Sequence, residues 1–330
     1  MRRLLSGAAL AAFLAGLLPL AASAAEPESG ALSILFENDI FFKTDRHYTN
    51  GVGLAYTTSP QDTAQWAVDL AHALPFFPKH GEVRTTFELG QDMFTPQNTA
   101  LANPDPTDRP YAGFLFGAIG VLSKSDSHLD QLRLQLGVVG PDSLAEETQI
   151  WVHSLLNDRK PAGWSFQLHN EPAVELTYER SLKIIPPKSF LGIFFDAEPH
   201  VGMAVGNVYD YFNAGLMGRA GINLPDDFGP LRLDPGLPGS SFFEPTGVIS
   251  AYVFAGVDGR AVGRNIFLDG NSFQASRSVD KNILVGDLQF GAAVAFKAWR
   301  VTFTHVFRTK EFRTQTSADQ FGAVSLTFRF

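Results

Sequence analysis

The chain has 330 residues, a formal net charge of −8 and no cysteine. A net acidic chain without a basic tract is a poor partner for the phosphates of nucleic acid, so we expect no nucleic-acid ligand. Without cysteine there is no disulfide framework, and stability must come from a large core or from a closed sheet.

The first 24 residues have the pattern of a secretory signal peptide. Two arginines follow Met1, an apolar run extends over 4–20, and the Ala-Ser-Ala sequence at 22–24 provides a small-x-small cleavage site. A single transmembrane helix is the alternative, but the apolar run is short and ends in a cleavage pattern. We therefore predict an exported protein with one domain over residues 25–330.

A polar turn separates the first two strand-like segments, with Asn38 and Asp39 on one side and Thr49 and Asn50 on the other. Asp39 could bind a hard divalent cation together with amide, hydroxyl and backbone oxygens. An oxygen-only donor set of this kind favours calcium. A hydrogen-bonded polar rim without a metal is the alternative.

Arg109, in the sequence Asp-Arg-Pro-Tyr-Ala-Gly at 108–113, starts the fourth strand-like segment. A guanidinium at that position could hold a phosphate or a developing oxyanion. Anchoring of the preceding loop to Asp105 or Asp108 explains the residue equally well. Earlier in the chain, 65–77 has the pattern of a short amphipathic helix.

A helix is predicted at about 142–158, within the connection 141–165. Asp142 or Ser143 is its expected N-cap, because both side chains accept hydrogen bonds from the first turn. Pro161 and Gly163 end the segment. The following Trp164 is interpreted as an interfacial aromatic residue.

Gln149 and His153 are four residues apart and therefore project from one face of this helix. A neutral imidazole is well suited to take a proton from water near neutral pH. A lone histidine on a helix more often has a structural or solvated role. The neighbouring glutamine and the polar turn expected at the same rim favour the chemical role.

Two later segments complete the pattern. Residues 223–246, rich in proline and glycine, form a long connection of unknown purpose. The last segment alternates apolar and polar residues up to the final Phe330. A terminal aromatic on such a strand is similar to the C-terminal signature of outer-membrane barrels; a soluble β-sandwich is the alternative.

Alternation of this kind recurs along the chain and predicts twelve strands in an antiparallel transmembrane β-barrel, apolar outside and polar inside. The candidate strands are about 30–42, 49–59, 83–93, 110–122, 128–140, 166–182, 189–204, 213–222, 247–260, 282–297, 298–309 and 319–330.

The parity of the strands assigns the connections. With both termini on the periplasmic side, every connection after an odd-numbered strand faces outward from the cell. These outward connections are about 43–48, 94–109, 141–165, 205–212, 261–281 and 310–318.

Several ordered motifs resemble the lipid A 3′-O-deacylase family, over essentially the whole of 37–330. They are Glu-Asn-Asp at 37–39, Asp-Arg-His-Tyr-Thr-Asn-Gly at 45–51, Arg-Pro-Tyr-Ala-Gly at 109–113, and Gln149 with His153 followed by Gly-Trp at 163–164. The resemblance implies a twelve-stranded outer-membrane barrel. It also implies a calcium-dependent enzyme that removes the 3′-linked acyloxyacyl chain from lipid A, the membrane anchor of lipopolysaccharide.

The same resemblance implies roles for the helix. His153 becomes the general base that activates water, and Gln149 orients or supports the histidine face. A second acidic residue is expected after the histidine, and Asp158 is the nearest candidate.

For the polar turn, the resemblance makes Asp39 the principal calcium ligand, with three neighbours shaping the site: Asn38, Thr49 and Asn50. Arg109 becomes a contact to the substrate phosphate or the oxyanion.

Two other functions compete with this one. An outer-membrane phospholipase would act on glycerophospholipid esters, although its usual serine and histidine pair is not visible near His153. A porin-like or adhesin-like barrel would bind ions in its loops without catalysis. The expected partners are lipopolysaccharide and the surrounding outer-membrane lipid, and a monomer is expected.

Overall fold

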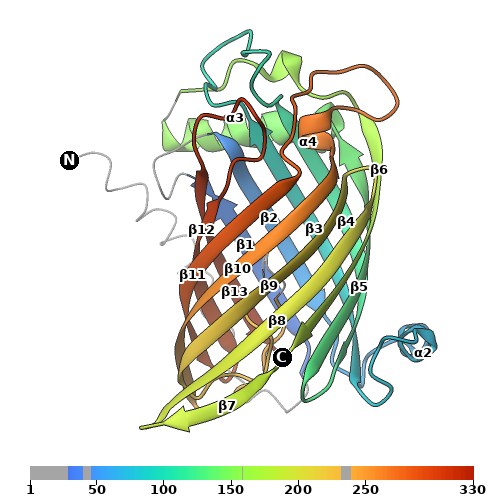
Figure 1. Ribbon diagram of the computed structural model, residues 1–330, viewed down its shortest axis with the longest axis vertical. Helices are drawn as coiled ribbons and strands as arrows, with labels where there is room; N and C mark the ends of the chain where they lie inside the picture. The colour runs from blue at the N-terminus through green and yellow to red at the C-terminus, as the bar shows by residue number, and fades with distance from the viewer. Residues whose placement is uncertain (1–28, 40–45, 158, 232–238) are drawn as a thin grey trace.

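The protein is described by a computed structural model that covers residues 29–39, 46–157, 159–231 and 239–330. The predicted signal peptide, residues 40–45 and Asp158 lie outside the described residues. Figure 1 shows a barrel of long, tilted strands. Its strands are β1 (Ala31–Asn38), β2 (His47–Thr57), β3 (Glu82–Thr95), β4 (Ala112–Lys124), β5 (His128–Val139), β6 (Glu171–Leu182), β7 (Ile185–Phe190), β8 (Ile193–Gly206), β9 (Tyr209–Ile222), β10 (Ile249–Asn265), β11 (Leu284–Phe296), β12 (Trp299–Arg308) and β13 (Asp319–Arg329).

Short helices accompany the strands in the described part of the chain. They are α2 (Gln65–Ala73), α3 (Ala145–Leu156) and α4 (Ile266–Asp269), with 3-10 turns η2 (Pro141–Ser143) and η3 (Trp164–Phe166). None of the described helices is long and apolar enough to span a bilayer.

Twelve of the strands form a closed antiparallel ring. The first strand pairs with the last, with Leu32 opposite Phe328. The ring passes directly from β6 to β8, where Leu176 faces Val205. The remaining strand, β7, pairs only with β8 and forms a hairpin below the ring. The predicted twelve-stranded barrel is therefore confirmed, and β7 is an addition that the alternation pattern did not reveal.

The connections divide between the two ends of the barrel, as an antiparallel ring requires. The connections that follow β1, β3, β5, β8, β10 and β12 lie at one end, which we call the α3 end. The opposite end, called the α2 end, contains α2 and β7. The first strand begins and the last strand finishes at this end. The segments predicted to share a rim therefore do so.

The barrel wall is apolar on its outer face. Along β8, Val201, Met203 and Val205 are 44%, 46% and 62% exposed, whereas the intervening residues are buried or half-buried. Inside the barrel, polar side chains pair with one another. Arg308 donates to Asp287 at 2.8 Å, for example. An apolar outer band and a hydrogen-bonded interior are what a bilayer demands of a barrel.

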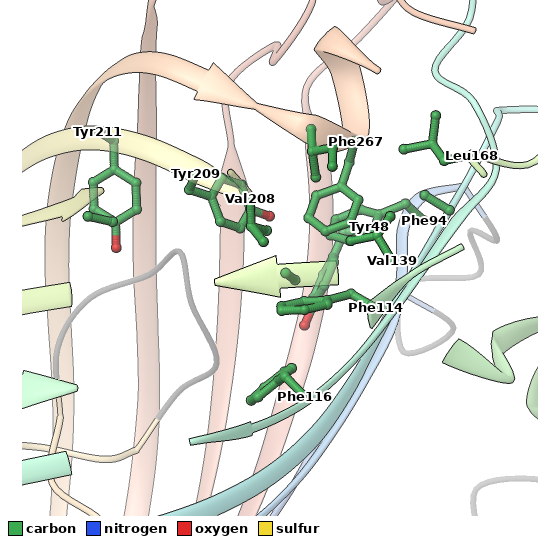
Figure 2. Packing of buried hydrophobic residues seen from close by; sticks show 14 of the residues in the cluster. Tyr48, Phe94, Phe114, Phe116, Val139, Leu168, Val208, Tyr209, Tyr211 and Phe267 are labelled. Atoms are coloured by element: carbon green, nitrogen blue, oxygen red, sulfur yellow. The ribbon is translucent and has the colours of Figure 1, made fainter. Parts of the chain in front are cut away.

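Aromatic side chains fill the barrel near the α3 end (Figure 2). Phe267 of α4 stacks on Phe94 with ring centroids 4.0 Å apart. Phe114 and Tyr209 contact the same ring at 6.1 and 5.5 Å. The helix α4 is held in position by Asn265, whose side chain accepts a hydrogen bond from the Phe267 N–H. This end of the interior is therefore packed and not open.

The β9–β10 connection fills the other half of the interior. Phe228, Phe242 and Phe243 are almost fully buried. The Ser33 hydroxyl on β1 donates to the Ser241 carbonyl at 2.8 Å. We call the described parts of this connection, 223–231 and 239–248, the plug. Nothing in the sequence indicated what this segment does. The structure shows the plug inside the barrel, packed against the strands that surround it.

Charged groups fix the plug to the strands. Asp227 is fully buried and lies between the guanidiniums of Arg219 on β9 and Arg300 on β12. Asp226 forms ion pairs with Lys124 and Lys183, at 2.7 and 2.6 Å. Burial opposes ionisation of Asp226, but the two ammonium groups outweigh it and hold its pKa below the ordinary value.

Three predicted boundaries were wrong. The sixth strand was expected from 166, but η3 occupies 164–166 and the strand begins at Glu171. The predicted loop 205–212 is only the two-residue connection 207–208, because β8 and β9 extend further than their apolar segments. The N-cap of α3 is Leu144, in the left-handed conformation (φ 59°). The two expected caps, Asp142 and Ser143, form the preceding 3-10 turn.

Removing the buried carboxylate of the plug should destabilise the barrel. Asp227→Ala leaves two buried guanidiniums without their shared partner, a loss of about 3–5 kcal/mol. The protein is heated to a series of temperatures and then run on a gel without boiling. The temperature at which the band of the folded barrel disappears should be clearly lower for the variant than for the wild type. Asp126→Asn, on the exposed β4–β5 connection, should change stability by less than about 0.5 kcal/mol. Equal transition temperatures for both variants would contradict this role of the plug.

Candidate active site

The candidate site lies on the outer face of the wall, at the α3 end of β1 to β4. Strand register places Asn38 opposite Asn50, Asn50 opposite Met93, and Met93 opposite Gly113. Residues directly opposite each other project from the same face of a sheet. This row therefore continues the outward-facing positions such as Val52, yet Asn38, Asn50 and Met93 are buried. Something covers them.

The cover over Met93 is α3, which packs on β3 and β4. A glycine at 113 makes this packing possible, because a Cβ there would overlap Ser143 Oγ and Ala145 Cβ. The Gln91 side chain, also on the outer face, donates to the Ser143 carbonyl at 2.6 Å. The start of α3 is thus held directly against the outside of the wall.

A buried apolar cluster fastens the same helix to the 3-10 turn behind it. Met93, Tyr111, Ala145 and Trp164 form this cluster. The indole N–H of Trp164 donates to Gln149 Oε1 at 2.8 Å. Trp164 is 1% exposed, so its interpretation as an interfacial aromatic was wrong. Gln149 positions the helix through this hydrogen bond.

The direction of α3 determines where His153 lies. In Figure 1 the helix lies across the α3 end of the barrel, and its contacts there are with β4 and β3. Eight residues of helix separate Ala145 from His153, or roughly 12 Å at 1.5 Å per residue. Three strand spacings from β4 to β1 amount to about 14 Å. A helix that starts at β4 and crosses the strands is therefore long enough to bring His153 toward β1 and β2.

A backbone carbonyl sets the tautomer of His153. Its Nδ1 lies 2.6 Å from the carbonyl oxygen of Arg159, just beyond the end of the helix. A carbonyl oxygen only accepts, so Nδ1 must carry the proton. In the neutral imidazole the lone pair is then on Nε2, the nitrogen that a general base uses. The histidine is half-buried. Asp158, the predicted acidic support, lies outside the described residues.

Oxygen-bearing side chains collect at the end of β1 and the start of β2. Asp39 is 3% exposed, and its Oδ2 accepts from the Arg46 N–H at 2.6 Å. The Thr49 hydroxyl, at a bulge in the β2–β3 register, is 2.7 Å from the Thr95 hydroxyl. Asn50 donates to the Glu37 carbonyl at 3.1 Å. The structure thus brings the predicted residues of the polar turn together.

The chemistry of this donor set fits a hard cation. Asp39 contributes a carboxylate, Asn38 and Asn50 contribute amide oxygens, and Thr49 contributes a hydroxyl. Oxygen ligands of mixed charge suit calcium better than zinc or copper. Among the described residues, no group of three or more histidine, aspartate or glutamate side chains could hold a metal. A site here would therefore depend on neutral oxygens beside one carboxylate.

Arg109 does not belong to this wall site. Its side chain is fully buried, lies 4.7 Å from the ring of the inward-facing Phe94, and donates to Glu311 at 3.1 Å. Burial opposes ionisation of Glu311, but Arg109 and Arg308 hold its pKa below the ordinary value. The contact of Arg109 to substrate stays a prediction, to which this buried position gives no support. The guanidinium anchors the loop through Glu311, while Asp108 anchors it by accepting hydrogen bonds from the Gln97 and Arg109 N–H groups.

Sequence reasoning missed several residues that build the site. His47 is fully buried, with Nδ1 2.7 Å from Asp319, and ties two connections together. Gly113 and the Arg159 carbonyl are equally important for α3. His47 and Gly113 stand within the motifs at 45–51 and 109–113 but were given no role of their own, whereas a contact to the Arg159 carbonyl leaves no trace in residue identity.

An apolar outside, a polar and filled inside and a closed antiparallel ring define an integral outer-membrane protein. A family model described as "Outer membrane protein LpxR" matches residues 8–330. The chain belongs to this family, which places the protein in the outer membrane. No curated protein sequence matches it.

One solved structure shares the fold, and two others are similar at lower TM-scores. LpxR from Salmonella typhimurium has a TM-score of 0.74 at 23% identity, covering 91% of this chain and 100% of that one. The β domain of the Bordetella autotransporter BrkA covers 92% and 100%, with 10% identity and a TM-score of 0.45. An outer-membrane channel from Pseudomonas putida F1 covers 95% and 100%, with 11% identity and a TM-score of 0.44.

The packing of α3 against the wall can be tested at Gly113. Gly113→Ala should displace the start of the helix, because the new methyl group meets Ser143 and Ala145. Limited trypsin digestion after Arg159 should become faster, as local opening exposes the segment. Gly117→Ala is a matched control on the same face of β4, where the nearest atom is 3.7 Å from the added Cβ. Equal digestion of both variants would contradict the packing described.

Proposed function

We propose that the protein is a calcium-dependent ester hydrolase that removes the 3′-linked acyloxyacyl chain from lipid A. Membership of the LpxR family and the sequence resemblance to lipid A 3′-O-deacylases support this activity. The observation that carries the proposal is His153 on α3, whose Nδ1 lies 2.6 Å from the Arg159 carbonyl so that Nε2 is the basic nitrogen, at the same end of the barrel as the polar residues of β1 and β2.

The height of the site suits an ester of a membrane lipid. Directly below the buried row, the outer face of the wall is apolar, with Val52, Leu54 and Leu89 40%, 44% and 56% exposed. The polar residues therefore begin where the hydrocarbon layer ends. Acyl chains of a lipid would lie along the apolar face while the ester between chain and sugar reaches the row.

His153 performs the proton transfers in this mechanism. Its Nε2 accepts a proton from the attacking water as the oxygen adds to the ester carbon. The Nδ1–H bond to the Arg159 carbonyl keeps the ring in orientation and stabilises the imidazolium that forms. The same proton then passes to the sugar oxygen as the carbon–oxygen bond breaks. Carboxylate and alcohol are the products, and no acyl-enzyme is formed.

Asp39 would hold calcium, with Asn38, Thr49 and Asn50 shaping the site. A calcium ion held there would supply positive charge beside the ester carbonyl oxygen, where negative charge develops during hydrolysis. The hydrogen bond from the Arg46 N–H orients the Asp39 carboxylate. Gln149 contributes by fixing the helix that bears the base.

The competing functions have less support. Ser154 is adjacent to His153, but its hydroxyl donates to the Ile150 carbonyl within the helix, at 2.7 Å. A serine used in this way is a poor nucleophile for a phospholipase of the serine type. The packed interior, with Phe267 at one end and the plug at the other, argues against a pore.

We further propose that residues 1–24 are a cleaved signal peptide and that the α3 end faces outward from the cell. Lipopolysaccharide occupies the outer leaflet, so only this orientation brings the wall site to its substrate. A monomer suffices, because the proposed site is built from one chain. Mass spectrometry of lipid A from cells that express the protein tests the function. Loss of the 3′ acyl groups supports it; intact lipid A with released phospholipid fatty acids would favour the phospholipase.

Replacing the proposed base should abolish hydrolysis while the barrel still folds. His153→Asn keeps a hydrogen-bond donor toward Arg159 but has no basic nitrogen. We expect the deacylation rate to fall by roughly 10²- to 10⁴-fold. The rate is measured on purified lipid A in mixed micelles, and folding by gel mobility without boiling. His80→Asn, exposed at the α2 end, should keep full activity. Wild-type turnover by His153→Asn removes the histidine from the mechanism.

Calcium should be needed for activity and should stabilise the fold. A chelator such as EGTA should suppress hydrolysis reversibly. Added calcium should raise the transition temperature, since a ligand at 100 times its Kd contributes about 2.7 kcal/mol. Asp39→Asn should lose both effects, whereas Asp105→Asn, an exposed carboxylate at the same end, should retain them. Full activity in chelator rules out the metal.

A further inference from the structure

The exposed edge of α3 is apolar. Leu144, at the N-cap, and Trp151 and Leu155 in the helix are 53%, 63% and 65% exposed. Their spacing of seven and four residues places them on one stripe. Large apolar side chains in a row on a helix that faced water would be costly to expose, so the stripe calls for a partner.

The stripe points away from the barrel. The opposite edge of α3 contains Ala145 and Gln149, which are 1% and 3% exposed and pack on the wall and on Trp164. No described part of the chain covers Trp151 or Leu155. Whatever contacts the stripe therefore approaches from outside the molecule.

The position of α3 identifies this contact as membrane lipid. The helix lies on the outer face of the wall, directly above the apolar band represented by Val52 and Leu89. Beside it, Leu136 on β5 and Val174 on β6 continue the same band, 54% and 52% exposed. The stripe is thus continuous with the surface that the bilayer already covers.

We propose that α3 is an interfacial membrane helix, whose stripe of Leu144, Trp151 and Leu155 enters the boundary between headgroups and acyl chains. Tryptophan favours this depth, because its ring is apolar and its N–H is polar. The charged Glu147, next to Leu144 on the exposed side, lies toward the headgroups. The inference depends on the barrel and on the seat of α3, and not on the chemistry of His153.

The immersion would fix the depth of the site. The row on the wall and the stripe lie on opposite sides of one helix about 10 Å across. Lipid in contact with the stripe would therefore support α3 at a fixed height on the wall, together with the residue His153 that the helix bears.

The lack of cysteine makes a direct test possible, since each single-cysteine variant carries one spin label. Labels are placed at Trp151→Cys and Leu155→Cys, with Val253→Cys on the lipid-facing wall and Ala102→Cys on the exposed β3–β4 connection as references. The protein is reconstituted in phosphatidylethanolamine and phosphatidylglycerol vesicles. Collision of each label with oxygen and with a water-soluble nickel complex is then measured.

We expect the oxygen-to-nickel ratio at 151 and 155 to exceed that at 102 by at least about threefold, since an interfacial helix buries its apolar face in the acyl boundary. Ratios equal to that at 102 would overturn the proposal. Labels that neither oxygen nor the nickel complex reaches, and whose spectra show spin–spin broadening, would also overturn it. That result would indicate that a second copy of the chain covers the stripe.

Trp151 itself gives an independent readout that needs no cysteine. Brominated lipids should quench part of the tryptophan fluorescence of the wild-type protein, and Trp151→Phe should remove that part. Unchanged quenching in Trp151→Phe would contradict the immersion. If the label and quenching results hold while His153→Asn keeps its activity, the proposed chemistry fails and the interfacial helix stands.

Discussion

The close contact between α3 and the outside of the barrel is the constraint on which the site depends. At Gly113 the wall has no side chain, and the first turn of α3 occupies that space. Met93 and Trp164 then bury the contact from both sides. A helix held further out would lose the hydrogen bond from Trp164 to Gln149 and would not cover Met93. The missing methyl group at Gly113 thus allows α3 to lie this close to the wall.

The interior and the exterior of the barrel serve different purposes. Inside, ion pairs and aromatic rings fill the space, and the plug joins β9 to β12 through Asp227. Outside, the polar residues of the candidate site lie at the α3 end of β1 and β2. Buried charges that pair with one another stiffen the cylinder, because breaking one pair leaves an uncompensated charge in a region without water. The rigid cylinder holds the outer site in a fixed position.

Much of this arrangement could be predicted from the sequence. Alternation with period two is local, and it predicted the twelve-stranded ring, the apolar outside and the polar turn at Asn38 and Asp39. The helix with Gln149 and His153 also has a local signature. The plug, the burial of Trp164 and the inward position of Arg109 depend on contacts between distant segments. Residue types do not report such contacts, so these features appeared only in the structure.

A site on the outer wall has a consequence for how it meets its ligand. For a lipid substrate, as proposed above, the search would take place in the plane of the leaflet by lateral diffusion past the barrel, and no molecule would need to leave the bilayer or cross an aqueous vestibule. Encounter frequency then follows the mole fraction of the lipid in its leaflet and the fluidity of that leaflet. Diluting the vesicles in buffer leaves both unchanged.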